Sequence, residues 1–282
     1  MTLDQINGIC IISHPRSGST HLSHQLHTAA GQSHSSVWWL GELLNPAAAS
    51  FDRFSRRLLP NGGWFDHTWP WPNPMELDRL DSVAEFAATG GFPIFKIFPA
   101  LDISYHNRQH VCDRIWHNRS FYKILLVRRD IRQQLLSHCI SLATDTWSVT
   151  DQQWIAQHET QTTLSTDTVQ QHIQRLKLWW TWVWLNQDKY HKIAWYHQLD
   201  TEHYPDLGFA PSDLRHHSST RMNVDHVQNG RKVLANFDAI AALCESAAAD
   251  ICPMVDLFAL QGRALYDRPQ TTQKLSICDS WR

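Results

Sequence analysis

The chain has 282 residues, of which 43% are hydrophobic and 18% charged, with a formal net charge of −2. A chain of this length can bury a large core, and its near-neutral charge excludes the basic field typical of nucleic-acid-binding proteins. It starts without a secretory leader pattern, and no apolar run reaches the about 20 residues that span a bilayer. We therefore expect a cytoplasmic protein, or a soluble domain trimmed from a longer chain. The six scattered cysteines suit small buried residues in a reducing compartment.

Short apolar runs and amphipathic helical patterns alternate along the chain. The expected elements are, in order, a strand at 8–13, a helix at 19–30, an apolar stretch at 37–40, a Pro-, Gly- and Trp-rich loop at 60–75, a helix at 76–89, a strand at 93–98, a helix at about 104–117, a strand at 121–127, a helix at 131–143, a long helix at 168–190, a strand at 193–196 and a helix at about 231–249. This alternation predicts one α/β domain over residues 1–282, a three-layer sandwich with a central parallel sheet. Phosphate loops in such folds lie at the carboxyl ends of the strands.

The turn after the first expected strand is an anion-site candidate. It reads Pro-Arg-Ser-Gly-Ser-Thr over residues 15–20, and a helical pattern follows. A strand, a tight turn and a helix N-terminus direct N–H groups at an anion, and the helix dipole adds about half a positive charge. The cradle would be completed by Arg16, Ser17, Gly18, Ser19 and Thr20.

This turn resembles the 5′-phosphosulfate loop of sulfotransferases, Pro-[Lys/Arg]-Ser-Gly-[Thr/Ser]-Thr. It does not fit the P-loop NTPase pattern Gly-x-x-x-x-Gly-Lys-[Ser/Thr], because it has one glycine and no lysine before Ser19. The resemblance implies a fold related to P-loop nucleotide kinases, 3′-phosphoadenosine 5′-phosphosulfate (PAPS) as co-substrate, 3′-phosphoadenosine 5′-phosphate (PAP) as product and no required metal. It also implies that Arg16 lies beside the breaking bond.

A second segment of the chain strengthens this resemblance. The strand at 121–127 runs into Arg-Arg-Asp-Ile-Arg at 128–132, and sulfotransferases have a similar strand followed by Arg-[Asp/Asn]-Pro-[Arg/Lys], with a serine eight residues after the first arginine. Arg129 and Ser137 have this spacing, and in the family these two residues hold the 3′-phosphate. A guanidinium at a strand end and a hydroxyl in the next helix can converge on one phosphate. The sequence departs from the family at Ile131, where proline is usual.

The predicted catalytic base is Glu42, which follows Gly41. This pair is similar to the Gly-Glu motif of several bacterial and carbohydrate sulfotransferases, whose trehalose-type members use the glutamate as the base. Its apolar neighbours at the end of an expected strand suit a general base. A glutamate at a helix N-terminus, favoured by the dipole, is the alternative interpretation. His14 and His138 are fallback bases.

Two further cations are site candidates. Cytosolic sulfotransferases have a Lys-x-His segment, and Lys96 has Phe98 where the histidine would stand. Lys96 remains a candidate for contacting the sulfate or the leaving oxygen, with an ordinary strand-end lysine as the alternative. Arg221, in a loop before a helix, is a weakly matching candidate for the nucleotide's 3′-phosphate.

The acceptor is expected to bind near an insertion at roughly 45–90. Its Trp-rich part, residues 64–72, can form a platform for a sugar or small alcohol, or can pack on the core. Trp179 and Trp180 fit a core helix face. The eighteen histidines lack the spacing of a zinc site, and the sequence does not indicate an oligomeric state. We therefore predict sulfuryl transfer from PAPS to a hydroxyl or an amine, with a P-loop-like kinase or NTPase, or a non-catalytic nucleotide-binding protein, as alternatives.

Overall fold

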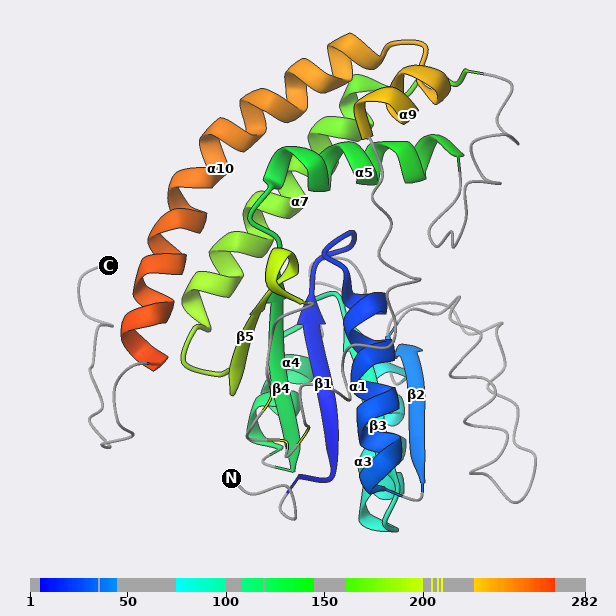
Figure 1. The fold of residues 1–282 in the computed structure, drawn as a ribbon, viewed down its shortest axis with the longest axis vertical. Helices are drawn as coiled ribbons and strands as arrows, with labels where there is room; N and C mark the ends of the chain where they lie inside the picture. The colour runs from blue at the N-terminus through cyan, green and yellow to red at the C-terminus, as the bar shows by residue number, and fades with distance from the viewer. Residues whose placement is uncertain are drawn as a thin grey trace.

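Five parallel strands form a single sheet in the order β2-β3-β1-β4-β5 in this computed structural model (Figure 1). The structure describes residues 6–34, 36–44, 75–99, 108–118, 120–144, 161–199, 204, 207, 209 and 226–266. The strands are β1 (Gly8–Ser13), β2 (Val37–Glu42), β3 (Phe92–Ile97), β4 (Phe121–Val127) and β5 (Lys192–Trp195). The helices are α1 (Ser19–Ser33), α3 (Met75–Ala88), α4 (Arg108–His117), α5 (Ile131–Thr144), α7 (Thr166–Leu185), α9 (His226–Val233) and α10 (Phe237–Tyr266), and a 3-10 turn covers Tyr196–Gln198. The prediction of an α/β fold with a parallel sheet is confirmed.

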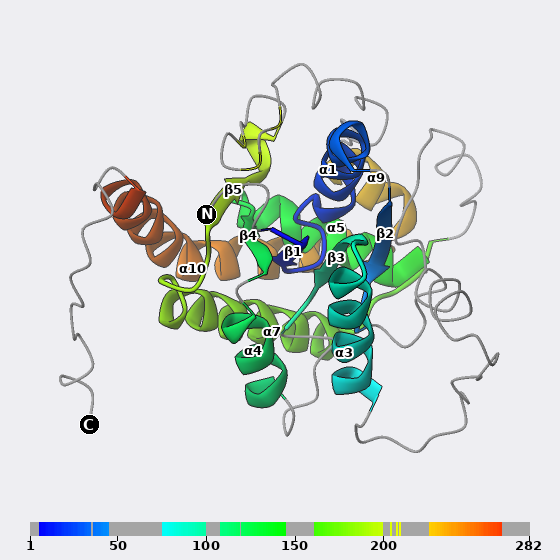
Figure 2. The ribbon, with the colours of Figure 1, turned by 90° about the horizontal axis from the view of Figure 1, so that it is seen from below.

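The strands are buried because helices cover both faces of the sheet. Every residue of β1, β3 and β4 is buried, as is typical of parallel strands. Side chains alternate along a strand, so Ile9 and Ile11 pack with α1, whereas Cys10 and Ile12 belong to the larger core. Figure 2 looks along the strands and shows α1 on one side of the sheet, with α3, α4 and α7 on the other.

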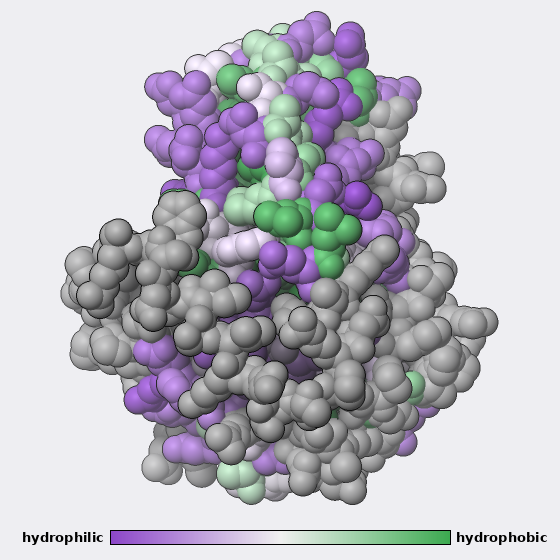
Figure 3. Space-filling model, turned by 90° about the vertical axis from the view of Figure 1, so that its left-hand side faces the viewer, coloured by the Kyte–Doolittle hydropathy of each residue, from purple (hydrophilic) through white to green (hydrophobic). Residues whose placement is uncertain are grey.

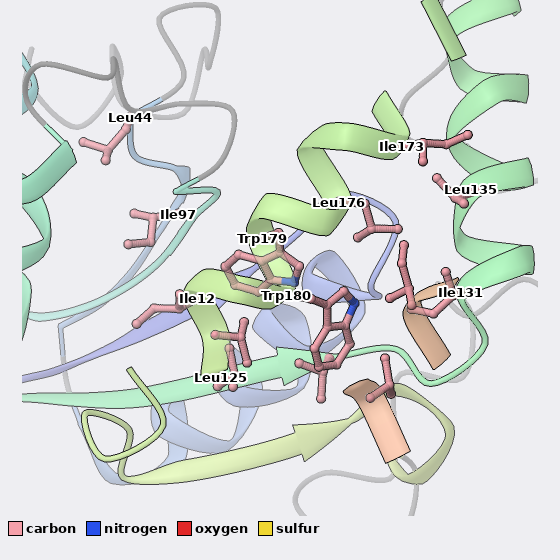
Figure 4. Packing of buried hydrophobic residues seen from close by; sticks show 14 of the residues in the cluster. Ile12, Leu44, Ile97, Leu125, Ile131, Leu135, Ile173, Leu176, Trp179 and Trp180 are labelled. Carbon is pink, nitrogen blue, oxygen red and sulfur yellow. The ribbon is translucent and has the colours of Figure 1, made fainter. Parts of the chain in front are cut away.

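The tryptophans of α7 are part of the larger core, as predicted. Trp179 and Trp180 are 2% and 1% exposed. Figure 4 shows the Trp180 ring between the sheet residue Leu125 and the α5 residue Ile131, with the Trp179 ring beside it on the same helix. Cys10, Cys139 and Cys244 are buried among apolar residues, in line with the expectation for this residue type.

The prediction of one helix at about 231–249 is wrong. The chain forms α9 and α10 there, separated at 234–236. Thr162 donates its N–H to the Val233 carbonyl and accepts from the Ala235 N–H, and the Asn236 side chain bonds to the backbone of Leu164. α10 also continues through Pro253 for a further thirteen residues, to Tyr266. Buried side chains at helical spacing hold that extension against the core, so packing outweighs the local cost of proline. They are Ile251, Val255 and Phe258.

The outer face of α10 is mainly hydrophilic. Figure 3 shows this face, where a small hydrophobic patch interrupts the polar surface. The large hydrophobic side chains exposed on α10 are Leu257 and Leu260. Among the helices that the structure describes, none is long and apolar enough to cross a membrane.

The strand order places β1 at the centre, between β3 and β4. The connection that leaves β1 leads to β2 on one side, and the chain returns through β3 to β4 on the other. Such a change of direction opens a crevice at the carboxyl ends of the strands, where α/β proteins bind ligands. The turns after β1, β2, β3 and β4 therefore meet at one edge of the sheet, called the carboxyl edge below.

Candidate functional site

The turn between β1 and α1 joins a strand to a helix N-terminus, in the order that the sequence predicts. α1 begins at Ser19, and its N-cap residue is Gly18, so no side chain caps the first turn. Gly18 has φ 87°, in the left-handed region that glycine tolerates. A Cβ at this position would lie 2.4 Å from Cδ2 of Tyr196, so the loop needs glycine for both conformation and space.

Arg16 also has a left-handed backbone, with φ 64°, although it carries a side chain. This conformation costs about 1–2 kcal/mol for a residue other than glycine, and such residues cluster at functional sites. The Arg16 side chain is directed across the carboxyl edge, where its Nε donates to Ser137 Oγ at 2.8 Å. Burial lowers the pKa of Arg16, and the charge of Arg128 lowers it further.

Two serines, one at the end of β1 and one in the turn, are buried without a hydrogen-bond partner in the part of the chain that the structure describes. They are Ser13, at the end of β1, and Ser17, in the turn, and their hydroxyl groups have no partner within reach. A buried hydroxyl without a partner is costly, so each one in a native protein calls for an explanation. A ligand oxygen within the turn would provide one for Ser17.

Lys96 connects the turn to Glu42. Its Nζ donates to Thr20 Oγ1 at 2.9 Å and lies 3.1 Å from Glu42 Oε1. Lys96 is buried, whereas the Glu42 side chain is 29% exposed, so the pair lies at the border between protein and solvent. The structure thus brings together three residues that the sequence singles out from three separate segments.

A β-bulge in β2 aims Glu42 at Lys96. The pairing of β2 with β3 shifts between Trp39 and Gly41, and Gly41 has φ 65°. With an uninterrupted register Glu42 would pair with Ile97, whose side chain faces the larger core. The bulge pairs it with Lys96 instead, which turns the carboxylate toward the α1 face of the sheet. This explains why glycine precedes Glu42: Gly41 provides the positive φ that the bulge requires.

Arg129 and Ser137 have different surroundings. Ser137 is buried and accepts the hydrogen bond from Arg16. Arg129 is 60% exposed and donates through Nε and Nη2 to Asp256 of α10, at 3.2 and 2.8 Å. The structure therefore brings Ser137 to the β1–α1 turn and pairs Arg129 with α10.

Sequence reasoning missed Arg128 and Tyr196. Arg128 is 7% exposed; its Nη1 donates to the Arg16 carbonyl at 3.1 Å and its Nη2 to Gln133 Oε1 at 2.9 Å. Its guanidinium lies 4.6 Å from the centre of the Tyr196 ring, which packs against Gly18. Arg128 and Arg129 are adjacent and lie just beyond the end of β4, where the alternation of a strand no longer applies. The sequence therefore does not indicate which of the two arginines is buried.

A buried histidine cluster lies behind the turn, and it includes both fallback bases. His138 shares a 2.9 Å hydrogen bond with His172 of α7, and the His14 ring lies 6.1 Å from the His138 ring. His14 donates through Nδ1 to the Pro15 carbonyl at 3.2 Å. Burial lowers the pKa of His14 to about 4 and that of His138 well below its usual value, and nearby cations, including Arg175, add to both shifts. Neutral rings this deeply buried are poorly placed to take a proton from an acceptor.

Several expected features lie outside the described residues: Arg221, the Trp-rich segment 64–72 and most of the insertion at 45–90. Within the described ranges, no group of three His, Cys, Asp or Glu side chains is arranged to hold a metal ion. Comparisons with protein-family models, with curated proteins and with solved structures gave no match.

Proposed function

We propose that the protein is a PAPS-dependent sulfotransferase with a fold related to P-loop nucleotide kinases. The observation that carries the proposal is the Glu42–Lys96–Thr20 contact, which joins the candidate base to the candidate donor loop. A strand, a turn and a helix N-terminus with an unpartnered buried hydroxyl at Ser17 add an anion site at the same place. PAPS would supply the sulfuryl group, with its phosphosulfate end bound in this turn.

Glu42 has the position of a general base. Its carboxylate is partly exposed at the carboxyl edge, so an acceptor hydroxyl can reach it from solvent. In the proposed reaction Glu42 takes the hydroxyl proton while the acceptor oxygen bonds to sulfur, and the bond from sulfur to the phosphate oxygen breaks. A positioned base contributes about 100- to 10,000-fold to such reactions.

Arg16 and Lys96 stabilise the charge that develops on the departing 5′-phosphate in this proposal. Both are held in place before any ligand arrives, Arg16 by Ser137 and Lys96 by Thr20 and Glu42. Preorganised cations in a partly buried site stabilise a transition state without reorganising, which is a large contribution to catalysis. Arg129 and Ser137 would hold the 3′-phosphate, and this requires Arg129 to exchange Asp256 for the nucleotide.

Calorimetric titration with PAP tests the donor site. We expect PAP to bind, and adenosine 5′-phosphate, which lacks the 3′-phosphate, to bind about 100-fold more weakly, because the lost group makes several charge-assisted hydrogen bonds. Arg16→Met should weaken PAP binding, whereas Arg114→Met, an exposed arginine paired with Asp81 on the other side of the molecule, should not. Binding of ATP with magnesium in preference to PAP would favour a kinase or NTPase and contradict the proposal.

Transfer of labelled sulfate from PAPS tests the chemistry. A panel of sugars, small alcohols and amines, incubated with the protein and labelled PAPS, should include acceptors that gain the label in a Glu42-dependent way. PAP binding without transfer to any acceptor class would indicate a non-catalytic nucleotide-binding protein.

A further inference from the structure

The left-handed Arg16 must be held by something outside its own segment, because an L side chain disfavours this conformation. Two buried side chains contact the carbonyl groups around it. Gln134 Nε2 donates to the Pro15 carbonyl at 3.0 Å, and Arg128 Nη1 donates to the Arg16 carbonyl at 3.1 Å. Arg128 lies in the short connection after β4 and Gln134 in the first turn of α5, so these two consecutive elements fix the orientation of two successive peptide groups of the turn.

The orientation of these carbonyl groups decides where the amide groups point. The C=O and N–H of a planar trans peptide point in opposite directions. The hydrogen bond from Arg128 to the Arg16 carbonyl therefore turns the Ser17 N–H away from Arg128, and Gln134 does the same for the Arg16 N–H. Successive N–H groups held on one side of a turn form the concave anion site that phosphate loops use.

Two contacts outside the turn hold Arg128 in place. Gln133 accepts from its Nη2, and its guanidinium stacks on Tyr196, which follows β5 and touches Gly18. A guanidinium with two fixed donors and 7% exposure is suited to holding the turn, while its charge keeps the site positive. This arrangement differs from that of Arg129, which is exposed and bonded to a surface carboxylate.

We propose that Arg128 is a positioning residue of the donor site: it holds the Arg16 backbone in its left-handed conformation, which aims the Ser17 amide and the Arg16 side chain at the 5′-phosphosulfate. This inference rests on the proposed function, because it presumes that the turn binds the 5′ end of PAPS. It separates the two neighbouring arginines by role, with Arg128 shaping the 5′ site and Arg129 assigned to the 3′-phosphate.

The test compares Arg128→Met, Arg128→Lys and the matched control Arg114→Met by calorimetric titration with PAP. Arg128→Met should weaken PAP binding about 10- to 100-fold, the effect of losing a charge-assisted hydrogen bond. Arg128→Lys keeps the charge and one donor and should recover part of the loss. Arg114→Met should bind PAP as the wild type does, because Arg114 is exposed on α4.

A spectroscopic measurement separates positioning from a general loss of stability. With saturating PAP, the ³¹P resonance of the 5′-phosphate should move in Arg128→Lys, while that of the 3′-phosphate stays in place. If Arg128→Met does not fold, Gln133→Leu removes an anchor of Arg128 without touching the turn and should weaken PAP binding in the same direction.

The outcomes distinguish this inference from the proposed function. A wild type that does not bind PAP overturns both. A wild type that binds PAP, with Arg128→Met or Gln133→Leu binding it equally well, overturns the positioning role of Arg128 alone, as does a 5′-phosphate resonance that does not move.

Discussion

Two buried lysines lie near opposite ends of the sheet, on β3 and β4, which β1 separates, and their side chains have different partners. Lys96, near the carboxyl end of β3, contacts side chains of two other elements, Thr20 of α1 and Glu42 of β2. Lys123, near the amino end of β4, donates instead to the backbone carbonyls of Asn118 and Phe121, at 2.7 and 3.4 Å. Burial lowers the pKa of Lys123.

The comparison of Lys96 with Lys123 shows which kind of buried charge indicates a functional site. Lys123 is satisfied by its own segment, so it needs no ligand and can be understood as part of the fold. Lys96 joins separate elements beside a strained turn and an unpartnered hydroxyl, at the edge where α/β proteins bind ligands. The following predictions test whether the two ends of the sheet differ in this way.

The largest expected effect is that of Glu42→Gln at the carboxyl edge. The amide cannot take a proton, so kcat for sulfate transfer should fall about 100- to 10,000-fold while PAP affinity stays nearly unchanged. Labelled sulfate transfer and calorimetric titration measure the two quantities. The matched control is Asp81→Asn, which removes an exposed carboxylate on α3 and should leave both unchanged. Normal turnover in Glu42→Gln would refute its role as the base.

The buried histidines behind the turn predict that the folded state loses stability in acid. His14 has a folded-state pKa of about 4 and an unfolded value near 6.5, so the unfolded state binds more protons between these values. Stability is therefore complete above about pH 6.5 and is lost as the pH falls toward 4. From these two pKa values, protonation linked to His14 alone should lower the free energy of unfolding by about 2 kcal/mol between pH 7 and pH 5. Denaturant unfolding at the two pH values measures this loss.

The control for this pH effect is His14→Asn, which keeps a donor for the Pro15 carbonyl but does not titrate. Its stability should fall less between pH 7 and pH 5 than that of the wild type. The lowered pKa of Lys123 acts in the same direction but in the alkaline range, below the usual value of 10.5. An equal acid loss in His14→Asn and the wild type would show that other groups cause it.

The paired variants Lys96→Met and Lys123→Met compare the two ends of the sheet directly. Lys96→Met removes a cation that contacts Glu42 and Thr20, so kcat should fall about 10- to 100-fold. Lys123→Met should leave kcat and PAP affinity unchanged, because its contacts are backbone carbonyls far along the strand from the turn. Steady-state kinetics at a temperature well below each variant's unfolding midpoint gives the comparison. Similar losses of kcat in both variants would remove the distinction between the two lysines.

The smallest expected effect concerns the exposed Arg129–Asp256 pair. In the proposed donor site Asp256 would compete with the 3′-phosphate for Arg129, so Asp256→Asn should tighten PAP binding by up to about fivefold, the range of exposed ion pairs. Adenosine 5′-phosphosulfate, which has no 3′-phosphate, should show no such gain. Asp250→Asn, on the same helix but paired with Lys177, is the matched control. An equal gain with both nucleotides would indicate a general charge effect and not the assigned role of Arg129.

The sequence by itself determined the parallel α/β fold and the turn after β1, because both depend on local patterns. Fully apolar runs are typical of strands buried on both faces, and a glycine before a helix marks the turn. The strands at 8–13 and 121–127 were therefore predicted with their observed bounds. Where packing outweighs local preference, as at Pro253 in α10, the prediction failed.

Only the tertiary structure decided how the site is assembled. The bulge at Gly41 depends on pairing with β3 and turns Glu42 toward Lys96, a contact between residues far apart in sequence. The choice of Arg128 over Arg129 as the buried arginine depends on the positions of Arg16 and Tyr196, which other strands provide. Local sequence specifies which residues can form a turn or a strand, but the side-chain contacts across the sheet edge exist only once the strands have paired.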